Sequence, residues 1–284
     1  MRNVFQRCAA RIVLTIPLAA FSIAPVSAGP ILGNAGAFAI LGGGGVAVNG
    51  TGSVITGSVG GCCVATAVTG YPGGFTDSGG TVYYTGSLPT GAETSAQADL
   101  STAITALSGV TPVISESTLD GKTLTPGYYS MGALTLTGTL TLDAKGNSNA
   151  LWVFLESSTL TTASGSDVTV INDGSGAGVG VYWVMGNSAN LGGTDGTSTF
   201  YGNILASTSI TVGTGVTDSC GSLLTTTASV TLAGDDTIGT GCQGGGMLTG
   251  TTFTPNASSV PEPGTFLFVA PGLAGLLFLR KRSR

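Results

Sequence analysis

The chain has 284 residues with a formal net charge of −5, and only 8% of them are charged, against about 25% in ordinary soluble proteins. Between residues 29 and 260 Lys122 and Lys145 are the only basic residues, which argues against a nucleic-acid partner because phosphate binding needs clustered Lys and Arg. The apolar fraction of 42% argues against disorder, so a chain this rich in Thr, Ser, Gly and Val is expected to be mainly β.

The first 28 residues predict a signal peptide. Arg2, Arg7 and Arg11 precede an apolar stretch at 12–23, and the small residues Val26-Ser27-Ala28 suit cleavage by signal peptidase after Ala28. The mature body, 29–247, is expected to form one domain because no internal linker divides it.

One segment of this body, 91–108, predicts an amphipathic helix. Its apolar residues share one helical stripe: Ala96, Leu100, Ala103, Ile104 and Leu107. Thr90 and Glu93 have the spacing of a capping box, and Gly109 marks the end. The helix is expected to brace the β structure.

Strands are expected at 132–143, 150–156, 158–162, 167–172, 180–185, 198–207, 209–212, 222–226 and 229–232. They sort into three recurring types. One type is strongly apolar, as at 151–155 and 179–184, another alternates small polar and apolar residues, and a third carries an occasional acid, as at 167–170. Three types in rotation predict a three-sided cross-section.

The alternating type repeats one short phrase at steps of about 20 to 30 residues. Its copies are Thr159-Leu160-Thr161, Ser188-Ala189-Asn190, Ser209-Ile210-Thr211 and Ser229-Val230-Thr231. Because strand side chains alternate between faces, each phrase directs two small polar residues to one side and an apolar residue to the other. Repeats of this length stack as a solenoid, so these pairs predict a flat, uncharged ladder.

The C-terminal residues form a tripartite tail after a polar linker at 248–259. Val260-Pro261-Glu262-Pro263 leads into an apolar run at 265–279, which a basic terminus closes at 280–284. The segment 260–284 resembles the PEP-CTERM sorting signal of Gram-negative bacteria. The resemblance implies transient membrane attachment, recognition by an exosortase and delivery to the cell surface or extracellular matrix. The alternative is a plain membrane anchor, although the run is shorter than the roughly 20 residues that span a bilayer.

Several motifs of the body resemble the DUF3494 ice-binding-like family in order along the chain. They are 32–41 (LGNAGAFAIL), 55–60 (ITGSVG), 124–129 (LTPGYY), 151–154 (LWVF) and 201–206 (YGNILA). The resemblance implies a discontinuous right-handed β-solenoid of triangular cross-section, with one long helix alongside and the N-terminal strands joining the C-terminal rungs. It also implies adsorption to ice through one flat solenoid face.

The family carries Thr-Ala-x-Thr phrases on its ice-binding rungs, and 208–211 (TSIT) is close to that phrase. The candidate ice contacts are Thr56, Thr159, Thr161, Ser188, Asn190, Ser209, Thr211, Ser229 and Thr231. The competing interpretation is that each is an ordinary outward strand residue, favoured by β propensity alone. Which of the three faces binds ice is left open.

Four cysteines remain after signal cleavage: Cys62, Cys63, Cys220 and Cys242. An even count in an exported protein indicates two disulfides. Because the family fold brings the N-terminal strands to the last rungs, we expect Cys62 and Cys63 to be cross-linked to the two C-terminal cysteines. A metal site is disfavoured, since the chain has no His and a vicinal pair lacks the spacing of zinc ligands.

An enzyme is not expected. The acidic residues are scattered, and the adjacent pair Asp235-Asp236 is expected to form a corner rather than a catalytic dyad. The run Gly42 to Gly45 lacks the Lys and helix of a phosphate-binding loop, so no cofactor is expected.

Two hypotheses from different classes follow. The first is a secreted ice-binding protein that inhibits crystal growth and recrystallisation, with the ice surface as partner and signal peptidase and exosortase acting during export. The alternative is a structural or adhesive matrix protein that uses the same solenoid at the cell surface, with exopolysaccharide as partner. Fold alone does not distinguish them, because function lies in the site.

Overall fold

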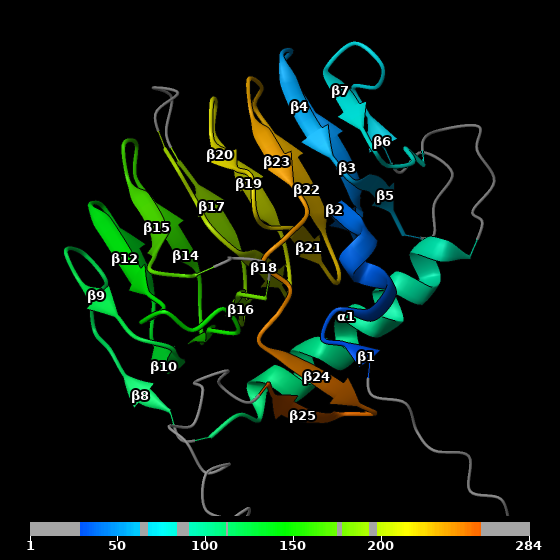
Figure 1. Ribbon diagram of the computed structural model, residues 1–284. Coiled ribbons are helices and arrows are strands. Elements are labelled where there is room, and N and C mark those ends of the chain that lie inside the picture. Colours follow the sequence, from blue (N-terminus) through cyan, green and yellow to red (C-terminus); the bar gives the residue numbers. More distant parts are fainter. Residues whose placement is uncertain are drawn as a thin grey trace, which may run out of the picture.

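The computed structural model describes residues 29–62, 68–83, 91–111, 113–174, 178–192 and 198–256. The expected signal peptide and the expected sorting signal lie outside these residues. Within them the chain forms stacked parallel strands around a common interior, with one α-helix along one side (Figure 1). The mainly β fold with a single long helix agrees with the expectation from sequence.

One sheet is covered on its outer face by the α-helix and is called the covered sheet here. It has eight strands in the order β5-β2-β21-β18-β16-β13-β10-β8. Its strands are β2 (Phe38–Gly42), β5 (Ser58–Gly61), β8 (Ile114–Ser115), β10 (Gly127–Met131), β13 (Leu151–Glu156), β16 (Gly180–Met185), β18 (Asn203–Ala206) and β21 (Leu223–Thr225). β16 and β18 are buried along their whole length. This sheet therefore has no free face at its centre.

A second sheet, called the open sheet because residues on one of its faces are exposed, has seven strands in the order β11-β14-β17-β19-β22-β3-β6. Its strands are β3 (Gly45–Val48), β6 (Val68–Thr69), β11 (Leu134–Leu136), β14 (Leu160–Thr162), β17 (Ala189–Leu191), β19 (Ile210–Val212) and β22 (Ser229–Leu232). In β11, β14, β17 and β19 a buried residue, an exposed residue and a second buried residue follow one another. One face of this sheet is thus buried and the other is open.

The third side is split into two sheets, of order β15-β12-β9 and β20-β23-β4-β7. The strands are β4 (Ser53–Thr56), β7 (Phe75–Ser78), β9 (Thr123–Leu124), β12 (Thr139–Asp143), β15 (Asp167–Ile171), β20 (Thr217–Asp218) and β23 (Thr237–Gly239). Single bridges from Thr199 to Asp167 and to Thr217 connect the two halves. Successive strands of the chain thus fall in the covered sheet, the open sheet and the split side in turn.

The stack is discontinuous in sequence. β2 pairs with β21, β3 with β22 and β4 with β23, so the N-terminal strands extend the stack beyond the C-terminal rungs. In Figure 1 the blue N-terminal strands lie beside the yellow and orange C-terminal ones. The long-range joining implied by the family resemblance is confirmed.

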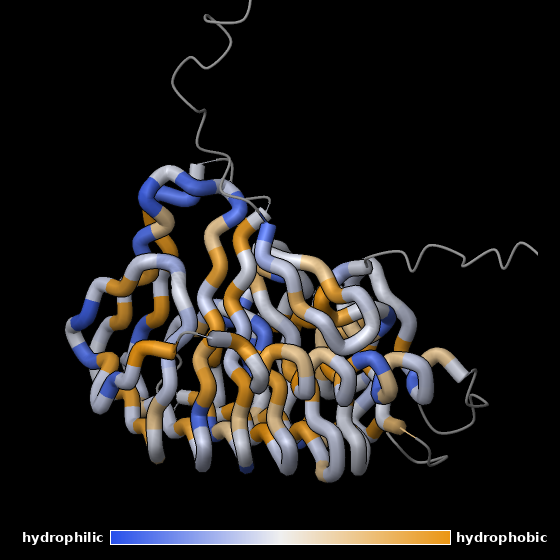
Figure 2. Tube along the Cα trace, turned by 90° about the horizontal axis from the view of Figure 1, so that it is seen from below, coloured by the Kyte–Doolittle hydropathy of each residue, from blue (hydrophilic) through white to orange (hydrophobic). Residues whose placement is uncertain are grey.

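The interior is lined by aromatic side chains from successive rungs. Phe154 stacks on Trp183 with ring centroids 4.0 Å apart, and Tyr129 and Phe200 extend the stack on either side. The hydropathy-coloured trace shows rungs that are mostly orange or near white, with few strongly hydrophilic segments (Figure 2). Burial of these large side chains supplies the main driving force for folding.

The helix α1 (Ala92–Ser108) packs its apolar stripe on the outer face of the covered sheet. Ala96, Leu100 and Leu107 are fully buried against side chains such as Val153 and Tyr182. The bracing role is therefore confirmed. The N-cap is Gly91, one residue later than expected, and Thr90 lies outside the described residues. Nowhere in the described part of the chain does a helix combine the length and the apolar character needed to cross a membrane.

The segment expected to begin the linker is instead folded. β24 (Gly246–Thr249) and β25 (Thr252–Pro255) form an antiparallel hairpin, and β24 also pairs with β1 (Gly29–Pro30). Leu248 and Phe253 pack beneath α1, which lies beside the short 3₁₀ helix η1 (Gly33–Ala37). The sequence did not predict this hairpin, because only alternate residues face the core and the segment is polar in composition. The domain therefore extends to Pro255.

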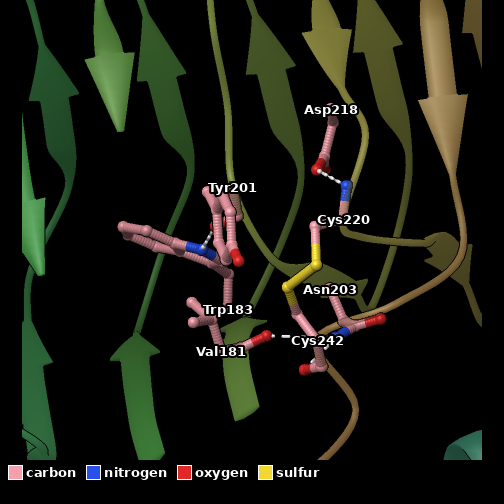
Figure 3. Close-up of a disulfide and its surroundings, with 7 residues drawn as sticks. All are labelled: Val181, Trp183, Tyr201, Asn203, Asp218, Cys220 and Cys242. Carbon is pink, nitrogen blue, oxygen red and sulfur yellow. Dashed lines mark hydrogen bonds between the residues drawn. A yellow bond between two sulfur atoms is a disulfide. The ribbon is translucent and has the colours of Figure 1, made fainter. Parts of the chain in front are cut away.

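The favoured disulfide pairing is wrong, because Cys220 is bonded to Cys242 (Figure 3). Asn203 fixes the same segment by donating hydrogen bonds from Nδ2 to the carbonyl oxygens of Val181 and Cys242. Cys62 also belongs to a disulfide, while Cys63 lies outside the described residues. The Cys220–Cys242 bond thus clips two C-terminal segments together rather than joining the two ends of the chain.

The strand expected at 132–143 is also divided into β11 and β12. Asp120 makes the corner by accepting hydrogen bonds from the backbone N–H groups of Thr137 and Gly138 and from the Thr137 hydroxyl, each at 2.8 Å. An unbroken apolar-polar alternation concealed this corner. Asp235-Asp236 does form a corner as expected, with Asp236 accepting the Val216 N–H at 3.0 Å.

Three fully or almost fully buried acids have a pKa that burial raises. Burial raises the pKa of Glu156 to about 7 and that of Asp236 to about 6, although backbone N–H groups oppose the shift. Burial also raises the pKa of Asp218 well above its ordinary value. Glu156 lies in register between Met131 and Met185, which explains why its charged form is poorly solvated.

We expect Phe154→Ala to lower the free energy of unfolding by about 4 kcal/mol, because it removes the centre of the aromatic stack and leaves a cavity. Urea denaturation followed by tryptophan fluorescence measures the change. Ser101→Ala, at an exposed helix position, is the control and should change the free energy by no more than about 0.5 kcal/mol. Equal effects of the two substitutions would contradict the assigned core.

We also expect the protein to lose stability as the pH rises from about 4 to about 8. The folded state holds protons on Glu156 and Asp236 at pH values where the unfolded state has released them, so deprotonation favours unfolding. Glu156→Gln should flatten this slope, because the amide does not titrate. Urea denaturation at several pH values measures how the free energy of unfolding depends on pH in wild type and in the variant. An equally steep dependence in the variant would contradict the role of Glu156.

Candidate functional site

The outer face of the open sheet combines exposure with regularity. The inward residues of each strand, such as Leu160, Ile210 and Val230, are fully buried and leave the intervening residue outside. Backbone hydrogen bonding between parallel neighbours holds each outward residue beside its counterpart on the next rung. The face is therefore a set of columns that cross the strands.

The central column contains the middle outward residue of every strand. Successive register pairs join Thr135 to Thr161, Thr161 to Asn190, Asn190 to Thr211, Thr211 to Thr231, Thr231 to Ala47 and Ala47 to Thr69. Five of the seven members are Thr, and none of the seven is charged or aromatic. The column crosses all seven strands.

A neighbouring column is formed by the residues two positions earlier: Thr159, Ser188, Ser209, Ser229 and Gly45. The Ser188 and Ser209 hydroxyls lie 3.0 Å apart, and Ser229 pairs with Gly45 in the backbone register. The backbone N–H groups of Leu160 and Ala189 donate to the carbonyls of Ser188 and Ser209, which keeps this edge in register. Small hydroxyl residues thus flank the central column.

The geometry of this face follows from strand stacking. Neighbouring rungs are about 4.8 Å apart and alternate residues of one strand about 6.7 Å apart. Thr hydroxyls at such positions can each hydrogen-bond water, while their methyl groups and Ala47 present apolar surface between them. The chemistry offered is an ordered array of weak polar anchors rather than a reaction centre.

The structure brings eight of the nine candidate contacts together on the open sheet. Thr161, Asn190, Thr211 and Thr231 stand in the central column, and the remaining four form the neighbouring one. Thr56 is the exception, because it lies in β4 on the split side, where it pairs with Gly239 and Ser78.

Three members of the central column were not predicted from the sequence: Thr135, Ala47 and Thr69. Thr135 sits in Leu134-Thr135-Leu136, whose alternation matches the other rungs but lacks the preceding small hydroxyl residue. Ala47 and Thr69 belong to the N-terminal strands, and only long-range pairing assigns them to this face. The alternation around Thr135 was the one local signal available.

Within the described ranges no three His, Cys, Asp or Glu residues gather closely enough to hold a metal ion. A groove of about 340 Å³ lies between α1 and the ends of the covered sheet, and its walls are mainly apolar, with Ile104, Leu155 and Val184 among them. The open sheet is the exposed surface on which most of the candidate contacts lie.

A solenoid-like stack of parallel strands, a covering helix and an uncharged column across the open sheet define the class of protein. Residues 40–238 match the family described as Ice-binding-like, and the chain therefore belongs to this family. A protein of Nostoc sp. (strain HG1) named "Ice-binding protein" is 40% identical over 259 residues, which cover 89% of this chain and 88% of that protein.

Solved structures of ice-binding proteins are also similar to this chain. The crystal structure of an ice-binding protein from the Antarctic ascomycete Antarctomyces psychrotrophicus is 33% identical, with a TM-score of 0.64, and the match covers 75% of this chain and 98% of that one. An ice-binding protein with antifreeze activity from an Arctic yeast is 26% identical, also with a TM-score of 0.64, over 74% of this chain and 94% of that one. The DUF3494 resemblance is thus confirmed.

Proposed function

We propose that the protein binds ice through the outer face of the open sheet. The observation that carries this proposal is the unbroken central column from Thr135 to Thr69, which crosses seven rungs in register without a charged side chain. The relatives named above as ice-binding proteins support the same function. The proposed activity is binding and not catalysis.

The mechanism follows from how the face would hold water. Each Thr hydroxyl anchors a water molecule, while the adjacent methyl groups limit competing hydrogen bonds, so the water above the face adopts an ice-like order. A charged side chain would fix the surrounding water in other geometries. Adsorption of this ordered layer to a crystal would inhibit growth and produce thermal hysteresis and inhibition of recrystallisation.

We further propose a specific form for the solenoid and a cellular location for the protein. The three sides would close a right-handed solenoid of triangular cross-section, because parallel crossovers are almost always right-handed. The Cys220–Cys242 bond supports export to an oxidising compartment. The tail at 260–284 would then be processed by an exosortase at the surface of a Gram-negative cell.

We expect Thr211→Tyr to reduce thermal hysteresis and inhibition of recrystallisation several-fold at equal protein concentration. Thr211 lies near the middle of the central column, between Asn190 and Thr231, so a large ring there would separate the face from a flat crystal surface. Because Thr211 is exposed, its replacement should change the free energy of unfolding by about 0.5 kcal/mol or less. Both activities are measured on the purified full chain.

The matched control is Ser101→Tyr, which places the same ring on an exposed position of α1 and should leave both activities unchanged. Equal activity of wild type, Thr211→Tyr and Ser101→Tyr would show that the open sheet is not the ice-binding site. If wild type showed neither activity, the surface-matrix alternative would replace ice binding.

A further inference from the structure

We propose that the four-stranded sheet of the split side, β20-β23-β4-β7, carries a second ice-binding surface on its outer face. This inference rests on the proposed function, since it extends ice binding from one face to two. Its starting point is the position of Thr56, which bears the residue type of the open sheet but lies on a different side of the molecule.

The second surface has its own column across the strands. Register pairs and one isolated bridge join Thr199 to Thr217, Thr217 to Thr237, Thr237 to Val54 and Val54 to Thr76. Four of these five residues are Thr, and Val54 keeps the same branched shape without the hydroxyl. Thr199, Val54 and Thr76 are exposed, while Thr217 and Thr237 are half-buried.

A shorter neighbouring column contains Gly239, Thr56 and Ser78, which pair in that order. The residues between the columns are Asp218, Ile238, Ile55 and Asp77; the first three are fully buried, and Asp77 on the last strand is half-buried. The outward residues of these two columns are therefore small and uncharged. The alternation of outward and inward residues resembles that of the open sheet over fewer strands, although two of the inward residues are acids.

Charged residues border the surface, and one of them is the exposed Asp235, which lies at the corner two positions before Thr237. On the far side of Thr199 the next outward residue is Asp167, which pairs with Thr139 in the other half of the split side. A carboxylate would hold water in a geometry unsuited to ice, so the proposed surface is confined to the rungs from Thr199 to Thr76. This boundary makes it smaller than the face of the open sheet.

Two surfaces on different sides of one core would present the protein to a crystal in two orientations. Inward residues of both sheets, such as Ile55 and Val230, belong to the same hydrophobic core, so the two faces are held by one packed interior. We therefore expect the full chain to adsorb to two sets of ice planes, one through each surface.

The test is adsorption of fluorescently labelled full chain to a single-crystal ice hemisphere. Thr211→Tyr should abolish one set of labelled planes, Thr237→Tyr the other, and the double variant both. Ser101→Tyr is the control and should label the same planes as wild type. Unchanged melting temperatures show that each variant is folded.

Two results would overturn the second surface while leaving ice binding intact. Either Thr211→Tyr alone would abolish all labelling, or Thr237→Tyr would label the same planes as wild type. Failure of the proposed function has a different signature, because wild type itself would then label no plane.

Discussion

The backbone ladder between parallel rungs is the constraint on which the rest of the molecule depends. It fixes the distance between neighbouring strands and therefore the repeat of any side-chain column that crosses them. In the open sheet the register runs without a shift from β11 to β6. In the covered sheet it shifts between Phe38 and Ile40, where β2 meets β5. Regularity is thus kept on the face that is exposed.

The division of roles among the three sides follows from burial. The covered sheet directs Trp152 and Trp183 into the interior and Val153 and Tyr182 toward α1, so it contributes to the core on both faces. The helix and residues of the β24-β25 hairpin pack on this side. The core therefore needs no large apolar residue on the open face, which can consist of Thr, Ser and Asn. The core and the proposed ice-binding face thus lie on different sides of the same strands.

The sequence predicted the elements whose signal is local. The stripe from Ala96 to Leu107 gave the helix, and the repeated phrases gave β14, β17, β19 and β22 with the correct outward residues. Family resemblance gave the joining of N-terminal to C-terminal strands, which local patterns do not contain.

Features that depend on tertiary contact were missed. The corner at Thr137 needs Asp120 from an earlier turn, and the β24-β25 hairpin needs β1 and α1 to receive it. The disulfide partner of Cys220 depends on the path of the chain from 240 to 246, which no spacing rule specifies. Thr56 shares its residue type with the open face and lies on another side, because its side is set by the pairing of β4 with β23.

We propose that the open face orders water at the repeat of its rungs. A crystal structure at a resolution that shows individual waters, with this face free of lattice contacts, tests it most directly. We expect one water at each rung between the two columns, hydrogen-bonded to the hydroxyls of residues such as Thr161, Thr211 and Thr231 and spaced like the strands. Waters scattered over the face without that repeat would contradict it.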